Sequence, residues 1–170
     1  MSEVLDPSEP PTHVRASQSL KPVELKVVFW NTNTWNAQNC EKLVETVVSS
    51  AADVVCIVDA RLDNYKARYI GGYCNTLKKA TGMTWRAKLV ARPDRRLKCT
   101  IGGDITFYSE KCSKVVKDSI LPYGTLSSLT MLWEGVQVRV LSAYRPYDSK
   151  ETSERSLRKA VLKALPDFES

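Results

Sequence analysis

Histidine is almost absent from this sequence of 170 residues, which contains only His13. Cysteine is sparse and odd in number, and no two cysteines form a Cys-x-x-Cys pair. Protein zinc sites need several cysteine or histidine ligands at short spacing, so this composition argues against a zinc site. We expect reduced thiols at all five positions, which are Cys40, Cys56, Cys74, Cys99 and Cys112.

Long hydrophobic runs are also missing. No segment approaches the roughly 20 apolar residues that span a bilayer, and the first thirty residues lack the pattern of a signal peptide. We therefore expect an intracellular protein, cytoplasmic or nuclear, with no membrane partner. The chain is 43% apolar, which suffices for one sizeable core, and it is too short to favour a second domain.

Positive charge is concentrated in one stretch. Residues Lys78–Lys98 contain eight basic side chains and one acid, Asp94, which gives this stretch a charge of +7 and leaves −1 for the rest of the chain. Such a patch attracts nucleic acid through its phosphates. The alternative is a solvated loop and edge strand protected by lysine and arginine.

The composition divides the chain into a tail, a domain and a short second tail. Residues 1–22 are rich in proline, serine and acids and have few apolar side chains, which predicts a disordered tail. Residues 23–166 form the predicted domain, and residues 167–170 follow it. No internal repeat is present.

The first half of the domain predicts a strand, a helix and a strand. Residues 25–30 are β-branched and aromatic, and apolar residues then recur at helical spacing from Cys40 to Ala51. Val54–Val58 is apolar throughout, as expected of a central strand covered on both faces. Residues 65–80 are ambiguous, although Gly71 and Gly72 favour a turn.

The second half predicts further strands and a terminal helix. Residues 85–91 and 105–108 have strand composition, and residues 129–133 and 136–140 flank Glu134 and Gly135 as a β-hairpin would. Apolar residues at helical spacing from Leu157 to Leu165 predict the last helix. Together these elements predict an α/β fold.

Polar side chains follow three of the predicted strands. Asn31 and Asn33 follow the first strand, Asp59 follows the central one, and Tyr144 follows the hairpin. Ligands of α/β proteins collect at strand ends because the loops there stand on a rigid base. The structural alternatives are a turn-forming asparagine, a capping aspartate and a core tyrosine.

Four segments in order resemble the endonuclease/exonuclease/phosphatase superfamily, most closely the apurinic-type endonuclease domains of non-LTR retrotransposons. They match that family's Trp/Leu-Asn-x-Asn opening, its Ala-Asp-Ile…Gln-Glu-Thr-x-Leu strand, its Gly-Gly strand and its Tyr-x-Pro motif. The matching segments are Val27–Asn33, Ala52–Leu62, Ile101–Ser109 and Ala143–Pro146.

The resemblance implies a layered β-sandwich with flanking helices and a phosphodiesterase site. It implies that Asn31 and Tyr144 contact or orient the scissile phosphate, and that Asp59, normally a glutamate, is catalytic and holds Mg²⁺ or Mn²⁺. Aspartate is one methylene shorter than glutamate, which reduces its reach. The expected nucleic-acid-binding residues are Asn33, Lys88, Arg92, Arg95, Arg96, Lys98 and Arg145.

The second half of the family pattern is missing. The Asp-x-Asn motif that orients the attacking water and the late Asp-His pair have no match, since Asp167-Phe168-Glu169 follows a helix and not a strand. The sequence thus predicts the first half of a nucleic-acid-directed, endonuclease-like phosphodiesterase that is inactive alone. The alternatives are a non-catalytic interaction module, and half of a nuclease completed by another chain. In either case a protein partner or self-association would cover the face of the missing half.

Overall fold

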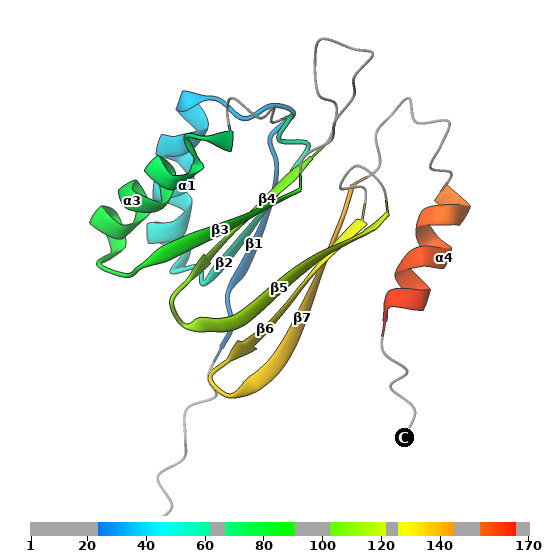
Figure 1. Cartoon of the computed structure of the whole chain (residues 1–170). Coiled ribbons are helices and arrows are strands. Elements are labelled where there is room, and N and C mark those ends of the chain that lie inside the picture. Colours follow the sequence, from blue (N-terminus) through cyan, green and yellow to red (C-terminus); the bar gives the residue numbers. More distant parts are fainter. Residues whose placement is uncertain (1–23, 62–66, 91–102, 122–125, 145–153, 166–170) are drawn as a thin grey trace, which may run out of the picture.

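The computed structural model describes residues 24–61, 67–90, 103–121, 126–144 and 154–165. Two β-sheets pack face to face, and two helices, α1 and α3, cover the outer face of the first sheet (Figure 1). The last helix, α4, lies beside the second sheet. This arrangement confirms the predicted α/β sandwich with flanking helices. The predicted tails, residues 1–22 and 167–170, lie outside the described residues.

The first sheet has the strand order β1-β2-β4-β3. β1 is parallel to β2, and β4 is antiparallel to both β2 and β3. The strands are β1 (Val27–Asn31), β2 (Val54–Val58), β3 (Trp85–Val90) and β4 (Asp104–Ser109). The four strand predictions for this sheet are therefore confirmed, with boundaries that differ by at most two residues.

β2 is the centre of the molecule. All five of its residues are buried, and its side chains alternate between two hydrophobic clusters. Val55 and Ile57 belong to the cluster beneath the helices, whereas Val54 and Cys56 belong to the cluster between the sheets. An apolar run without polar interruption is what a strand covered on both faces requires.

Helix α1 (Ala37–Ser50) begins at a capping box. The Asn36 side chain accepts from the backbone N–H of Asn39, and the Asn39 side chain accepts from the N–H of Asn36. Leu43 and Val47 are buried against the sheet. The helix ends where Ala51 adopts a left-handed conformation, with φ of 51°.

Helix α3 (Ile70–Thr81) corrects the turn predicted at Gly71 and Gly72. Both glycines lie in its first turn, where a glycine is tolerated although it weakens the helix. Ile70 and Leu77 supply the buried face of the helix. This apolar periodicity outweighs the local preference of the two glycines.

The second sheet has the strand order β5-β6-β7 and is antiparallel throughout. β6 (Leu126–Trp133) and β7 (Val136–Ala143) form the predicted hairpin. Glu134 and Gly135 both have positive φ, 49° and 83°, as a two-residue hairpin turn requires. β5 (Cys112–Leu121) was not predicted, because its lysines and serines interrupt the apolar pattern.

Helix α4 (Glu154–Ala164) confirms the predicted last helix. Its buried residue is Ala164, whose carbonyl accepts a hydrogen bond from the Arg139 guanidinium of β7 at 2.9 Å. Leu162 and Leu165 are exposed, so this helix covers less apolar surface than α1 does. No helix among the described residues is long and apolar enough to cross a bilayer.

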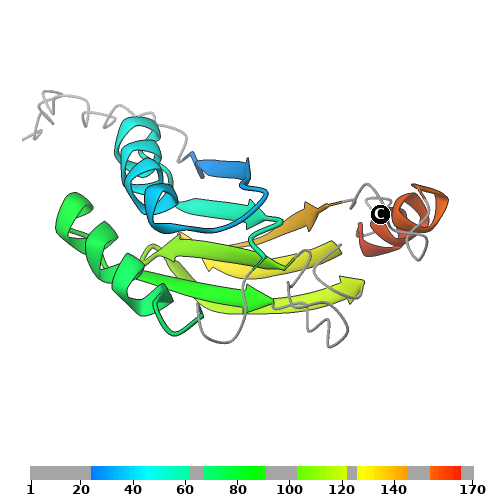
Figure 2. The ribbon, with the colours of Figure 1, turned by 90° about the horizontal axis from the view of Figure 1, so that it is seen from above.

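The two sheets pack with one edge strand of the first sheet on the same side as one edge strand of the second. Seen from above, β1 and β7 lie along one margin of the sandwich, and β3 and β5 lie along the other (Figure 2). β1 and β7 are each at the end of their sheet in the strand order. Only one side of each strand is therefore paired among the described residues.

Candidate functional site

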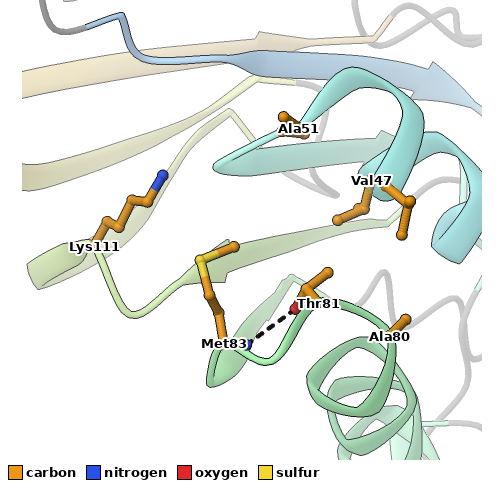
Figure 3. A pocket seen from close by; sticks show the side chains of 8 residues that line it. Val47, Ala51, Ala80, Thr81, Met83 and Lys111 are labelled. Carbon is orange, nitrogen blue, oxygen red and sulfur yellow. Dashed lines mark hydrogen bonds between the residues drawn. The ribbon is translucent and has the colours of Figure 1, made fainter.

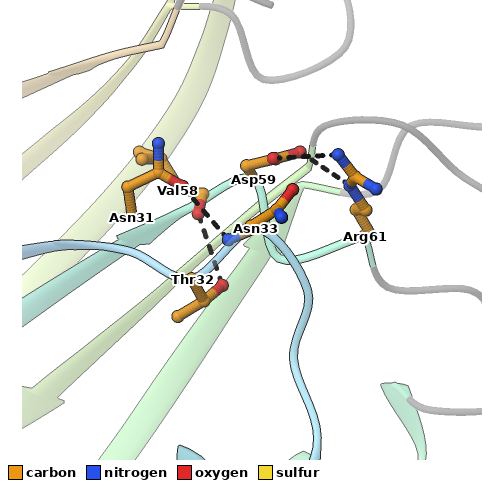
Figure 4. Close-up of polar contacts among 6 residues, drawn as sticks. All are labelled: Asn31, Thr32, Asn33, Val58, Asp59 and Arg61. Carbon is orange, nitrogen blue, oxygen red and sulfur yellow. Dashed lines mark hydrogen bonds and ion pairs between the residues drawn. The ribbon is translucent and has the colours of Figure 1, made fainter.

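Asn31 and Asp59 lie together at one end of the first sheet. Asn31 is the pairing partner of Val58, the residue before Asp59. The backbone N–H of Thr32 donates to the carbonyl of Val58 at 3.3 Å, which holds the two strand ends in register. The backbone N–H of Asn33 donates to Oδ1 of Asn31 at 3.1 Å (Figure 4). Asn31 therefore forms a turn with its side chain, and its phosphate contact stays a prediction.

Asp59 is buried and forms a two-point ion pair with Arg61. The Asp59 side chain is 2% exposed and the Arg61 side chain is 39% exposed. Arg61 Nε lies 3.3 Å from Oδ1 of Asp59, and Arg61 Nη2 lies 3.4 Å from Oδ2 (Figure 4). This charge partner could not be identified from the sequence, and the capping role considered for Asp59 stays a prediction.

The backbone around this pair is unusual. Asn33, Asp59 and Arg61 all have positive φ, at 55°, 52° and 47°. Asparagine and aspartate tolerate the left-handed region better than arginine does. Residues with such backbone angles cluster at functional sites, where the surrounding structure holds them. Ala60, between Asp59 and Arg61, donates to the carbonyl of Gly103 and accepts from the N–H of Trp35. These two hydrogen bonds fix the turn.

Tyr144 lies at the same end of the sandwich, in the second sheet. It follows Ala143, the last residue of β7, and is half-buried. Near this strand end Ser142 pairs with Ser127 of β6, and Ser127 donates to Oδ2 of Asp104 at 2.5 Å. Asp104 in turn pairs with Val58. The three residues predicted to share a site thus follow strand ends on one side of the molecule, and their proposed roles stay predictions.

A buried charge pair lies between the sheets beside these strand ends. The Lys117 ammonium is 2.8 Å from Oδ2 of Asp104, and the two side chains are 3% and 1% exposed. Lys117 also donates to the Thr106 hydroxyl at 2.8 Å. Sequence reasoning missed this pair, although an aspartate directly before an apolar strand, as in Gly-Gly-Asp104, was a signal for it.

Buried polar and thiol groups surround this pair. Burial raises the pKa of the neighbouring Cys56 thiol to about 11, although Lys117 and a hydrogen bond with Thr106 act in the opposite direction. Oδ1 of Asp104 and the Ser142 hydroxyl are buried and have no hydrogen-bond partner among the described residues. The interior at this end of the sandwich is therefore more polar than the core around β2.

The opposite end of β2 has a different character. Asp53 accepts from the Lys26 backbone and from the Lys111 ammonium, which lies 2.8 Å from its Oδ1. This hydrogen bond raises the pKa of Lys111. Lys111 also borders a pocket of about 230 Å³ between the carboxyl ends of α1 and α3, lined by Val47, Val48, Ala51, Ala52, Ala80, Thr81 and Met83 (Figure 3). None of the predicted site residues lines this pocket.

The predicted basic surface is described only in part. Lys88 is exposed on β3, next to exposed Arg86, and Lys78 and Lys79 are exposed at the end of α3. Arg86 and Lys88 alternate along β3 with Trp85, Ala87 and Leu89, which pack beneath the helices, whereas Lys78 and Lys79 are on α3. The other predicted nucleic-acid contacts lie outside the described residues, namely Arg92, Arg95, Arg96, Lys98 and Arg145.

The described residues at this site do not by themselves fit a resident divalent cation. No three histidine, cysteine, aspartate or glutamate side chains gather into a cation site within the described part of the chain. Mg²⁺ is held by one or two carboxylates with waters and substrate phosphates. Asp59 offers one carboxylate, both of whose oxygens accept from Arg61, and Oδ1 of Asn31 accepts from Asn33.

Comparison with known proteins identifies the fold. No family model matches the sequence, and no curated protein matches it. Among solved structures, an endonuclease/exonuclease/phosphatase family protein from Leptotrichia buccalis C-1013-b superposes with a TM-score of 0.59 and 14% identity over 85% of this chain. An AP endonuclease from Archaeoglobus fulgidus superposes with a TM-score of 0.52 and 17% identity over 84% of this chain.

The matches cover 63% of the bacterial protein and 53% of the archaeal one. Both neighbours therefore contain a large part that has no counterpart here. At these identities the likeness concerns architecture, since one fold serves many functions. The two-sheet sandwich with α1 and α3 on its outer face has the fold of endonuclease/exonuclease/phosphatase family proteins.

Proposed function

We propose that this chain is the first part of a diverged, nucleic-acid-directed phosphodiesterase domain of the apurinic endonuclease type, as carried by non-LTR retrotransposons, and that it does not cleave nucleic acid alone. The observation that supports this most is the placement of Asn31, Asp59 and Tyr144 at strand ends on one side of this fold. One of the two structural neighbours is itself an AP endonuclease. Such a protein would work in the cytoplasm or nucleus.

The expected lack of cleavage follows from the donor set. Hydrolysis of a phosphodiester needs an activated water and a cation or donors that stabilise the charge of the transition state. The described residues provide one carboxylate at the site, and Arg61 already neutralises it. The Mg²⁺ or Mn²⁺ implied by the family would require further ligands from outside the described residues.

Nucleic-acid binding without cleavage is the first testable outcome. Purified protein incubated with supercoiled DNA and with abasic-site duplex, in Mg²⁺ or Mn²⁺, should retard the duplex in a gel and leave both substrates intact. Retardation should weaken as salt rises, because phosphate contacts release counterions. Nicking that Asp59→Ala abolishes would contradict the proposed inactivity, and absence of binding at low salt would contradict the proposed substrate.

A second candidate function is an interaction module that uses the β1 and β7 margin of the sandwich, whose outer side is unpaired among the described residues. β1 contains no charged residue, and its Phe29 side chain is 53% exposed. Half-buried Val27 of β1 and Val138 and Val140 of β7 line the same margin, at the border of the inter-sheet core. The β3 margin, in contrast, presents exposed Arg86 and Lys88.

This contrast distinguishes a protected edge from an unprotected one. Natural sheets place lysine and arginine on edge strands that stay in solvent, since an apolar open edge recruits another strand. The β3 margin follows that rule and the β1 margin does not. We therefore propose that a second copy of this chain pairs along β1 and β7.

A further inference from the structure

Arg61 is the charge partner of the buried Asp59 carboxylate. Its guanidinium makes two contacts with the buried carboxylate, at 3.3 and 3.4 Å, while 39% of its side chain faces solvent. The positive φ values of Asp59 and Arg61 turn the side chains of these two residues toward each other (Figure 4). The hydrogen bonds of Ala60 to Gly103 and Trp35 secure that turn on both sides.

The geometry leaves donors available for a ligand. A guanidinium has five N–H groups in a planar fork, of which this pair uses two. The same fork binds the oxygens of phosphate, and an arginine anchored at one side by a carboxylate is already oriented for it. Asn31 lies at the neighbouring strand end, with a side-chain amide that has donors of its own.

We propose that Arg61 replaces the divalent cation at this strand-end site, so that the site binds a phosphate of nucleic acid without Mg²⁺. The inference rests on the proposed nucleic-acid ligand and adds the means by which it is bound. A guanidinium donates hydrogen bonds to phosphate oxygens through N–H groups that the Asp59 pair leaves unused, although its single charge is shared with Asp59. It does not lower the pKa of a bound water, as a metal ion does, so binding through Arg61 carries no hydrolysis.

The binding test uses a fluorescein-labelled duplex oligonucleotide, titrated with the full chain in EDTA and in Mg²⁺ at equal ionic strength. Affinity should be the same in both buffers. Arg61→Gln should weaken binding about tenfold or more, since a charge-assisted hydrogen bond contributes roughly 1.5–3 kcal/mol. Arg158→Gln on exposed α4 removes the same charge elsewhere and should change affinity less than about twofold.

A further variant separates charge from geometry. Arg61→Lys keeps the positive charge and loses the fork, so its affinity should lie between those of wild type and Arg61→Gln. Circular dichroism melting of each variant confirms that it is folded. Equal affinity of Arg61→Gln, Arg158→Gln and wild type would overturn the proposal.

Metal binding gives an independent readout. Mn²⁺ titration followed by electron paramagnetic resonance should detect no site in wild type that Asp59→Asn removes. Arg61→Gln exposes the carboxylate and should create a weak Mn²⁺ site, which the Asp59→Asn/Arg61→Gln double variant loses. A wild-type site that Asp59→Asn removes, or duplex binding that requires Mg²⁺, would overturn the role of Arg61 and leave the proposed function standing. Failure of wild type to bind duplex in either buffer would overturn the proposed function itself.

Discussion

Lys117 and Asp104 form the most costly pair of side chains in the described structure. Both are almost fully buried between the sheets, and removing two charges from water costs several kcal/mol per ion. The ion pair, Thr106 and Ser127 offset that cost in part, while Oδ1 of Asp104 has no described hydrogen-bond partner. Removing either side chain therefore leaves the other charge buried without a partner, which destabilises the fold.

Single and double substitutions test this dependence. Asp104→Asn leaves Lys117 buried without its counter-charge, and Lys117→Met does the same to Asp104. Each should lower the free energy of unfolding by about 3–5 kcal/mol. The double variant should lose clearly less than the sum, as measured by urea denaturation. Additive losses would show that the two charges are not coupled across the sheets.

Side-chain chemistry was predictable from sequence where a strand boundary marked it. Asn31, Asp59 and Tyr144 follow apolar runs, so their position at strand ends could be predicted. Arg61 and Lys117 could not, because an arginine in a loop and a lysine in a mixed strand usually face solvent. The Arg61 partner is set by positive φ values that residue types do not reveal, and the Lys117 partner is set by sheet packing between residues distant in sequence.

Helix α3 shows how tertiary packing overrides local preference at the scale of an element. Gly71 and Gly72 are exposed in its first turn, and a Cβ at either position would meet nothing within 4 Å. The helix forms because Ile70 and Leu77 pack beneath it. Gly82 differs, since it ends the helix with a φ of 74°.

Two alanine substitutions should therefore have opposite effects. Gly72→Ala should raise the free energy of unfolding by about 0.4–1 kcal/mol, because it restricts the unfolded chain and suits the helix. Gly82→Ala should lower it by about 1 kcal/mol, since alanine is strained in the left-handed region. Thermal and urea denaturation of the two variants measure both signs. Destabilisation by Gly72→Ala would show that this turn is not helical in solution.

Strands could be predicted from the sequence where apolar residues continued through the whole strand or a defined turn joined two strands. β2 and the β6–β7 hairpin have uninterrupted apolar runs or a defined turn, and both were predicted. Three of the first six residues of β5 are lysine or serine, namely Ser113, Lys114 and Lys117, and they hide its alternation. Its pairing with β6 across register shifts between Ser113 and Val116 depends on contacts that sequence periodicity does not contain.

The whole molecule has a charged side and a nearly neutral one. The Lys78–Lys98 stretch has a charge of +7 and the rest of the chain −1, and the described residues of the stretch lie on α3 and along the β3 margin. The β1 and β7 margin lies on the opposite side of the sandwich (Figure 2). β1 has no charge, and the single charge of β7, Arg139, is engaged with α4. Two copies that meet at this margin therefore bring no concentrated like charges together.

A twofold axis perpendicular to the sheets would pair β1 with its own copy in antiparallel orientation. Phe29 is the middle residue of Val27–Asn31, so it would face the partner's Phe29 across the axis. The axis reverses strand direction, which places the two Asp59 sites at opposite ends of the dimer. The second copy would thus extend the sheets and not supply the missing catalytic groups, so association and cleavage are separable.

Sedimentation velocity over a range of protein concentrations tests this arrangement. Wild type should approach twice the monomer mass of 19.1 kDa as concentration rises. Phe29→Lys should stay monomeric, because like charges would face each other across the axis. Val116→Lys makes the same kind of change at an equally exposed residue on the β5 margin, so it should associate as wild type does. A wild type that stays monomeric, or association that Phe29→Lys leaves intact, would show that the β1 margin does not pair with a second copy.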